Sequence, residues 1–100
     1  MNVKDRSSLA ELRPVGTGQA LTSSDTPQSF TSFGDCRAVL MTVRTQAISV
    51  TVDGETSPDA AVGLNLPAGD VRLWSKEAAE AMSIHQSAGG AATVYAQGMA

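Results

Sequence analysis

Two short apolar runs, and the change of phase between them, most constrain what this chain can fold into. From 39 to 43 the candidate core side chains occupy odd positions, whereas from 48 to 52 they occupy even positions. Period-two alternation is typical of a half-buried strand and not of an amphipathic helix. An antiparallel hairpin with one buried face, closed by a loop from Arg44 to Ala47, accounts for the change of phase. The sequence therefore predicts a hairpin with three buried pairs: Val43 with Ile48, Met41 with Val50, and Val39 with Val52.

Further short strands are expected on either side of turn signals. Two more strand pairs are predicted, 62–66 with 71–74 across Pro67–Asp70, and 82–85 with 92–97 across the sequence QSAGG. Ser75 is a good N-cap for one or two helical turns that end at Met82. Short strands with frequent turns favour an all-β fold, a small antiparallel β-sandwich with at most one short helix.

The composition changes near residue 30, so we expect an N-terminal arm and polar entry segment over residues 1–29 and a β-sandwich domain over residues 30–100. Ser8 and Glu11 have the spacing of a capping box, and Pro14 limits that helix to a single turn. The first residues are either a disordered tail or an extended arm that docks apolar side chains on a neighbouring chain. The candidate docking residues are Val3, Leu9, Leu12 and Val15.

Composition and charge exclude several classes of function. Apolar residues make up 42% of the 100 residues but aromatic residues only 4%, so the core is built mainly from aliphatic side chains. Residues 1–45 hold five Lys/Arg and four Asp/Glu, a net of +1, whereas residues 46–100 hold two and six, a net of −4. This balance argues against a nucleic-acid-binding protein. The chain begins without a signal-peptide core and has no run long enough to cross a membrane, so we expect a soluble protein that folds in the cytoplasm.

No catalytic, cofactor-binding or metal-binding motif is present, so we expect no enzyme, no cofactor and no metal site. Cys36 and His85 are the only residues of their kinds, and one of each cannot make a structural zinc site. We expect Cys36 to be an inert thiol and His85 to be exposed on a strand. Asp53, Glu55 and Asp59 are close enough in sequence to gather around calcium, but turn residues that solvate a loop explain them better.

Arg72, Trp74 and Tyr95 are candidate interface residues. If Val71 and Leu73 face the core, then Arg72 and Trp74 face outward, and Tyr95 is likewise out of phase with its apolar neighbours. Exposed Trp, Tyr and Arg are typical anchors of protein interfaces and of sugar-stacking surfaces. In the alternative interpretation, Trp74 ends its strand and covers the edge of the core.

Four segments in this order resemble a group of small tailed-bacteriophage virion proteins: GTGQALTSSDTPQSF, CRAVLMTVRTQAISVTVDGETSP, LNLPAGDVRLW and MSIHQSAGGAATVYAQG. The resemblance covers about residues 16–98 and rests on an apolar strand before a mid-chain polar loop, the LPAG turn and the closing GGAATVYAQG strand. It implies a jelly-roll-like β-sandwich that decorates or cements a capsid, or that lies at the base of a fibre or spike. It supplies no catalytic residues.

The sequence and the resemblance together lead to one expectation. A small body with few aromatic residues gains stability from neighbours. We expect a non-enzymatic structural protein located in the virion and assembled in the host cytoplasm, most directly a capsid decoration or cement protein. Its partners are copies of itself and the major capsid protein or another virion protein, with no nucleic acid and no membrane. A tail, adaptor or fibre-base component is the alternative within this class, and a carbohydrate-binding module that uses Trp74 and Tyr95 is the alternative outside it.

Overall fold

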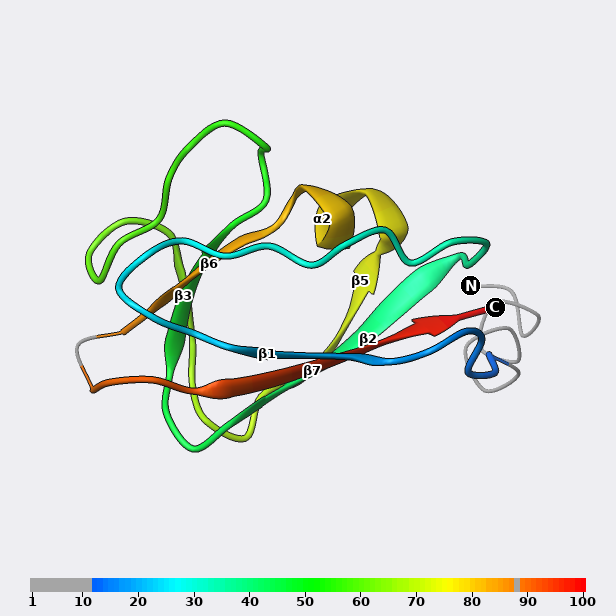
Figure 1. Ribbon diagram of the computed structural model, residues 1–100, viewed down its shortest axis with the longest axis horizontal. Coiled ribbons are helices and arrows are strands. Elements are labelled where there is room, and N and C mark those ends of the chain that lie inside the picture. Colours follow the sequence, from blue (N-terminus) through cyan, green and yellow to red (C-terminus); the bar gives the residue numbers. More distant parts are fainter. Residues whose placement is uncertain (1–11, 88) are drawn as a thin grey trace, which may run out of the picture.

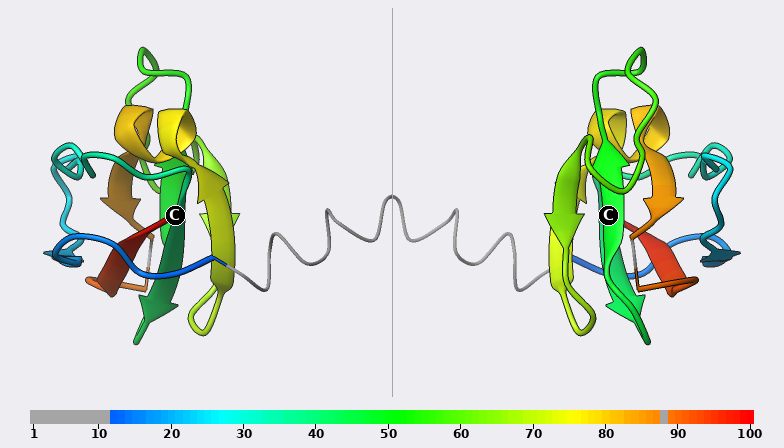
Figure 2. Two further views of the ribbon diagram at one scale, coloured as in Figure 1. Left: turned by 90° about the vertical axis from the view of Figure 1, so that its right-hand side faces the viewer. Right: turned by 90° about the vertical axis from the view of Figure 1, so that its left-hand side faces the viewer.

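The computed structural model describes residues 12–87 and 89–100, which form two antiparallel β-sheets that pack face to face (Figures 1 and 2). One sheet has the order β1-β7-β2-β5, with β1 at Gln19–Thr22, β7 at Thr93–Met99, β2 at Ala38–Arg44 and β5 at Val71–Ser75. The other has the order β4-β3-β6, with β4 at Leu64–Leu66, β3 at Ile48–Thr51 and β6 at Ser83–Gln86. One short helix, α2, occupies Lys76–Ala81. The predicted small all-β antiparallel fold is confirmed.

The chain is wound like one long antiparallel hairpin that passes back and forth between the two sheets. At its tip, β3 pairs with β4 across the loop 52–63. Moving outward from the tip, β2 pairs with β5, Gln28 bridges Ile84 of β6, and β1 pairs with β7. The two partners of each pair lie at similar distances along the chain from the tip, and successive pairs fall in alternate sheets. This is the connectivity of a jelly roll in which the strand before β2 is reduced to the bridge at Gln28.

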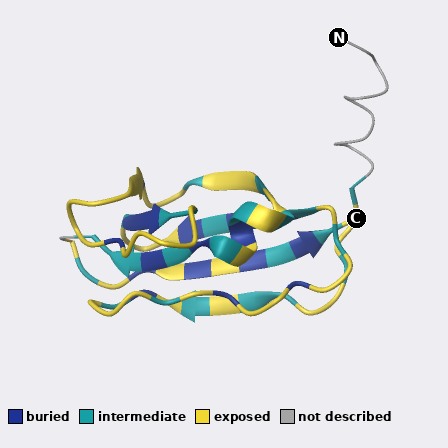
Figure 3. Cartoon of the chain, turned by 90° about the horizontal axis from the view of Figure 1, so that it is seen from above, coloured by how far each residue is buried: buried dark blue, intermediate teal, exposed yellow. Residues whose placement is uncertain are grey.

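The core lies between the sheets and includes the residues that the alternating runs predicted. Five of the six predicted side chains are buried, namely Val39, Met41, Val43, Ile48 and Val50, and the sixth, Val52, is half-buried against them. Figure 3 shows the buried and exposed bands that alternate along the strands. The cluster is completed by Phe30, Phe33, Leu66, Ala79, Met82, Ile84, Ala92, Val94 and Ala96.

The three predicted hairpins are wrong. In each of them the two strands belong to different sheets: β2 and β3, β4 and β5, and β6 and β7. Alternation shows only that two strands turn apolar faces toward one core, and strands on opposite sides of a sandwich meet this requirement as well as neighbours do. The connection between β2 and β3 crosses from one sheet to the other at Thr45, whose φ is 74°. The turn Pro67–Asp70 is present as predicted, but it joins β4 to β5 in the same crossing manner.

The helix begins where the sequence predicts. The Ser75 hydroxyl accepts a hydrogen bond from the Ala78 N–H at 3.1 Å, and the helix ends before Met82. Glu80 Oε2 accepts hydrogen bonds from the Phe33 N–H at 3.0 Å and from the Ser32 hydroxyl at 3.2 Å. The bond from the Phe33 backbone is the main reason that the pKa of Glu80 is lowered. These bonds connect α2 to the segment that leads into β2.

The predicted N-terminal segment, residues 1–29, contains β1, and the residues just before β1 continue the backbone pairing with the end of the chain. Arg13 and Ala100 exchange two backbone hydrogen bonds of 2.9 Å, and the Val15 N–H donates to the Gly98 carbonyl at 2.9 Å. Leu12 and Val15 are half-buried beside this end of β7. The other expectations for the arm, Val3, Leu9 and the capping box of Ser8 and Glu11, lie outside the described residues.

Val50→Asp should prevent folding, because Val50 has no exposed surface and a buried, unpaired carboxylate costs several kcal/mol. The stability of a small domain is only about 5–15 kcal/mol. Val62→Asp is the matched control, since Val62 is 42% exposed and the same change there should cost about 1 kcal/mol or less. Urea denaturation followed by circular dichroism measures both. Equal stability of the two variants would contradict the inward orientation of β3.

Thr45→Asn should raise the free energy of unfolding by about 0.5–1 kcal/mol, because a β-branched residue is strained at positive φ and Asn tolerates this region. Thr22→Asn in β1 is the control, since Asn disfavours a strand and should leave stability equal or lower. Equilibrium denaturation of both variants checks the prediction. A destabilised Thr45→Asn protein would show that the Thr45 hydroxyl matters more than the backbone strain.

Candidate functional site

Apolar side chains gather on the outer face of the four-stranded sheet, away from the core. Val71 is 64% exposed, Tyr95 41% and Leu73 38%. The strand register brings them together, because Thr42 of β2 lies between Tyr95 and Val71, and Leu40 lies beside Leu73. We call this set the outer patch: Leu40, Thr42, Val71, Leu73 and Tyr95. It crosses β7, β2 and β5.

Tyr95 is held in a fixed position on this face. Its ring lies directly over Gly18, where any side chain would collide with it. Its hydroxyl donates to Gln97 Oε1 at 3.2 Å, and the Gln97 amide donates to the Val15 carbonyl at 2.9 Å. A shallow hollow of about 240 Å³ beside the ring is also lined by Ala20, Arg44 and Thr93. An exposed aromatic ring that is already ordered loses little conformational entropy when a partner covers it.

The expected orientation of β5 is wrong. Val71 and Leu73 face solvent, whereas Trp74 is half-buried and packs against the core, opposite Val39 of β2. The Arg72 guanidinium carbon lies 5.7 Å from the centre of the Trp74 ring, and the guanidinium binds Asp70 at 3.2 Å. The structure therefore agrees with the alternative interpretation, in which Trp74 covers the edge of the core.

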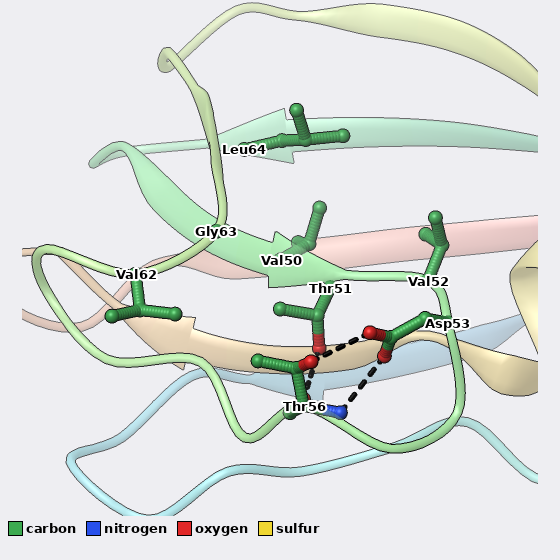
Figure 4. Close-up of a pocket in the computed structure, with 8 residues that line it drawn as sticks. All are labelled: Val50, Thr51, Val52, Asp53, Thr56, Val62, Gly63 and Leu64. Atoms are coloured by element: carbon green, nitrogen blue, oxygen red, sulfur yellow. Dashed lines mark hydrogen bonds between the residues drawn. The ribbon is translucent and has the colours of Figure 1, made fainter.

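A second hollow, of about 310 Å³, lies beside β4 at the edge of the three-stranded sheet. Its apolar wall includes Val50, Val62 and Leu64, of which Leu64 is 50% exposed. Figure 4 shows the loop that forms its rim, with Asp53 and Thr56 joined by hydrogen bonds. The hollow is open to solvent, and its lining is mainly apolar.

The acidic side chains of this loop bind the loop itself. Asp53 accepts hydrogen bonds from the Thr56 hydroxyl at 2.6 Å and from the N–H groups of Glu55 and Thr56 at 3.0 and 2.8 Å. These bonds, with the Thr56 hydroxyl first, lower the pKa of Asp53 to about 2. Asp59 accepts in the same way from the N–H groups of Ala61 and Val62. Within residues 12–87 and 89–100, no group of three or more His, Cys, Asp or Glu is placed to hold a metal ion.

The single histidine and the single cysteine both have structural surroundings. His85 Nε2 lies 3.0 Å from the Asp25 carbonyl oxygen and Nδ1 faces the Gln86 carbonyl, so the ring is half-buried and not exposed as expected. Cys36 is a free thiol that packs, half-buried, against the core. Neither side chain lies in the outer patch.

Comparison with protein-family models, with curated proteins and with solved structures finds no match to this chain. Among the described residues, no helix has the length and apolar character needed to cross a bilayer.

Sequence reasoning identified Tyr95 but missed the rest of the outer patch. Leu40 was passed over because it occupies an outward position in a strand whose core residues were already assigned. The phase of β5 was misjudged because five residues with apolar side chains at three positions fit either orientation. The charge of Arg72 favours an outward position in the sequence. In the structure Arg72 lies at the sheet edge, where its guanidinium pairs with Asp70, so this charge points to the wrong orientation of β5.

Asp53→Asn should make the free energy of unfolding less dependent on pH in the acid range. Because the folded pKa of about 2 lies below the ordinary 3.8, Asp53 contributes stability above pH 3.8 that is lost as the pH falls through about 2. The free energy of unfolding of the wild-type protein should therefore fall more steeply across this window than that of the variant. Urea denaturation at a series of pH values measures the slopes. Parallel slopes would contradict the hydrogen bonds assigned to Asp53.

Proposed function

We propose that this chain is a non-enzymatic structural protein of a bacteriophage virion, most directly a capsid decoration protein. It self-associates and binds the coat lattice, and it is assembled with the particle in the host cytoplasm. Its jelly-roll winding supports the proposal, because viral capsid proteins are among those that use this architecture. The resemblance of the four sequence segments to small virion proteins points in the same direction.

The observation that carries the proposal is the outer patch. An ordered aromatic ring with exposed aliphatic side chains on the outer face of a sheet is the surface expected of a protein that binds another protein. The patch is formed by regular strands and not by loops, so it presents one rigid shape to a repeating partner. Such a surface fits attachment to a lattice of identical subunits.

Of the two alternative functions, one fits the outer patch as well as capsid decoration does, and the other fits it less well. A tail, adaptor or fibre-base protein would use the outer patch in the same way and differs only in its partner. A carbohydrate-binding module that stacks sugars on both Trp74 and Tyr95 is disfavoured, because these side chains lie on opposite faces of one sheet. Only Tyr95 remains available for stacking.

The test follows the protein into particles. Virions purified by density gradient from the source of this chain should contain it. Tagged Tyr95→Lys supplied during particle production should be incorporated at least about tenfold less than tagged wild type, a loss of about 1.4 kcal/mol or more. Ala60→Lys adds the same charge at an exposed loop position outside the patch and should be incorporated normally.

Two results would contradict the proposal. One is the absence of the folded chain from purified particles when it is present in the lysate. The other is binding of wild type to a glycan array that is lost in Tyr95→Ala, which would favour the carbohydrate-binding module.

A further inference from the structure

The two sheets have four edge strands, and the described residues protect three of them. The edge of β6 is bonded to the segment before β2, since Gln28 and Ile84 exchange backbone hydrogen bonds of 2.8 and 2.7 Å. Beside β1, the Gln19 side chain binds both the N–H and the carbonyl of Thr31 at 3.0 Å. The third edge strand, β4, is three residues long and is followed by Pro67. Short strands, proline and covering segments are the usual protection of sheet edges.

The fourth edge strand, β5, has no such cover among the described residues. It is five residues long and bonds only to β2, and its outward side chains Val71 and Leu73 are exposed. Its one charge, Arg72, is balanced by Asp70 at 3.2 Å. An edge strand that is uncovered, apolar on its outer face and without net charge is a template for pairing with another strand.

The hydrogen bonds of β2 fix which backbone groups are free. The Val43 N–H donates to the Asp70 carbonyl at 2.9 Å, so the even-numbered residues of β5 direct their N–H and C=O groups toward β2. The N–H groups of Val71, Leu73 and Ser75, with the carbonyls of the first two, therefore point to the open edge.

We propose that β5 pairs antiparallel with β5 of a second copy, across a two-fold axis beside Leu73, so that the two four-stranded sheets become one continuous sheet. In this register Leu73 exchanges both backbone hydrogen bonds with its own equivalent. The Ser75 N–H of each copy donates to the Val71 carbonyl of the other. The inference deepens the self-association in the proposed function and rests on that part of it alone.

The side chains favour this register over the next one. On the inner face, Arg72 lies opposite Trp74 of the second copy, an arrangement suited to the cation–π contact that each copy already makes within itself. At the end of the ladder, the first residue of α2, Lys76, comes level with Asp70 of the second copy, whose Oδ2 is buried without a partner among the described residues. An axis beside Arg72 would place two guanidinium groups directly opposite each other, which is unfavourable.

Pairing also changes the outer patch. Val71 and Leu73 of both copies meet at the axis, with Tyr95 on each side at the level of Thr42. The dimer therefore presents an apolar surface twice as wide as that of one copy, on one face of a continuous sheet. A wider surface of fixed geometry binds a repeating partner through two attachments at once.

Cross-linking tests the register. In a full-length Cys36→Ser background, Leu73→Cys should form a disulfide-linked dimer under mild oxidation, because directly opposite residues of a hydrogen-bonded pair have Cα atoms about 5.5 Å apart, within disulfide range. Val71→Cys in the same background is the matched control and should remain unlinked, since its opposite residue is Ser75. Failure of Leu73→Cys to cross-link, or equal cross-linking of the two variants, overturns the proposal.

Sedimentation equilibrium tests whether the chain forms a dimer through β5. Wild type should be dimeric at about 10–100 µM, and Leu73→Lys, which places two like charges at the axis, should raise the Kd at least about tenfold. Tyr95→Lys should remain dimeric although it is expected to lose particle binding, which separates this inference from the proposed function. A wild type that is monomeric throughout this range overturns the pairing, as does a folded Leu73→Lys that dimerises like wild type, whatever the result with particles.

Discussion

The shared burial of β2 and β3 is the interaction on which the rest of this structure depends. Consecutive in the chain but in opposite sheets, these strands contribute Val39, Met41, Val43, Ile48 and Val50 to one cluster with almost no exposed surface. Each such side chain contributes about 1.5–3 kcal/mol when it is removed from water. After β3 the chain returns through both sheets, and β4, β5 and β7 pair in turn with β3, β2 and β1. The crossing at Thr45 is the step that places the consecutive strands β2 and β3 in different sheets.

Most elements could be predicted from the sequence, whereas their partners could not. Alternation identified the inward side chains of β2 and β3, and the cap at Ser75 located α2, because these signals depend on neighbours along the chain. Pairing depends on residues far away in sequence, and hairpins and sheet-crossing connections leave the same pattern of polar and apolar positions. The short β5 shows a second limit, since only its pairing with β2 decides that Val71 faces solvent and Trp74 the core.

The outer patch could likewise be predicted only in part from the sequence. Tyr95 could be identified because an aromatic residue out of phase with Val94 and Ala96 must point away from them. Its neighbours in the outer patch come from β2 and β5, and nothing in the local sequence indicates that those strands lie beside β7. The exposed aromatic was therefore predictable as a single residue, while the surface it belongs to required the strand order.

The position of β7 in the middle of its sheet has a consequence for how the protein forms during translation. Both β1 and β2 pair with β7, and they do not pair with each other. Until the ribosome has delivered Thr93–Met99, β1 has no partner in its sheet and β2 has only one. The three-stranded sheet can close earlier, because all its strands precede residue 87. The four-stranded sheet is thus completed only when β7 is inserted between β1 and β2, so its assembly depends on the last strand of the chain.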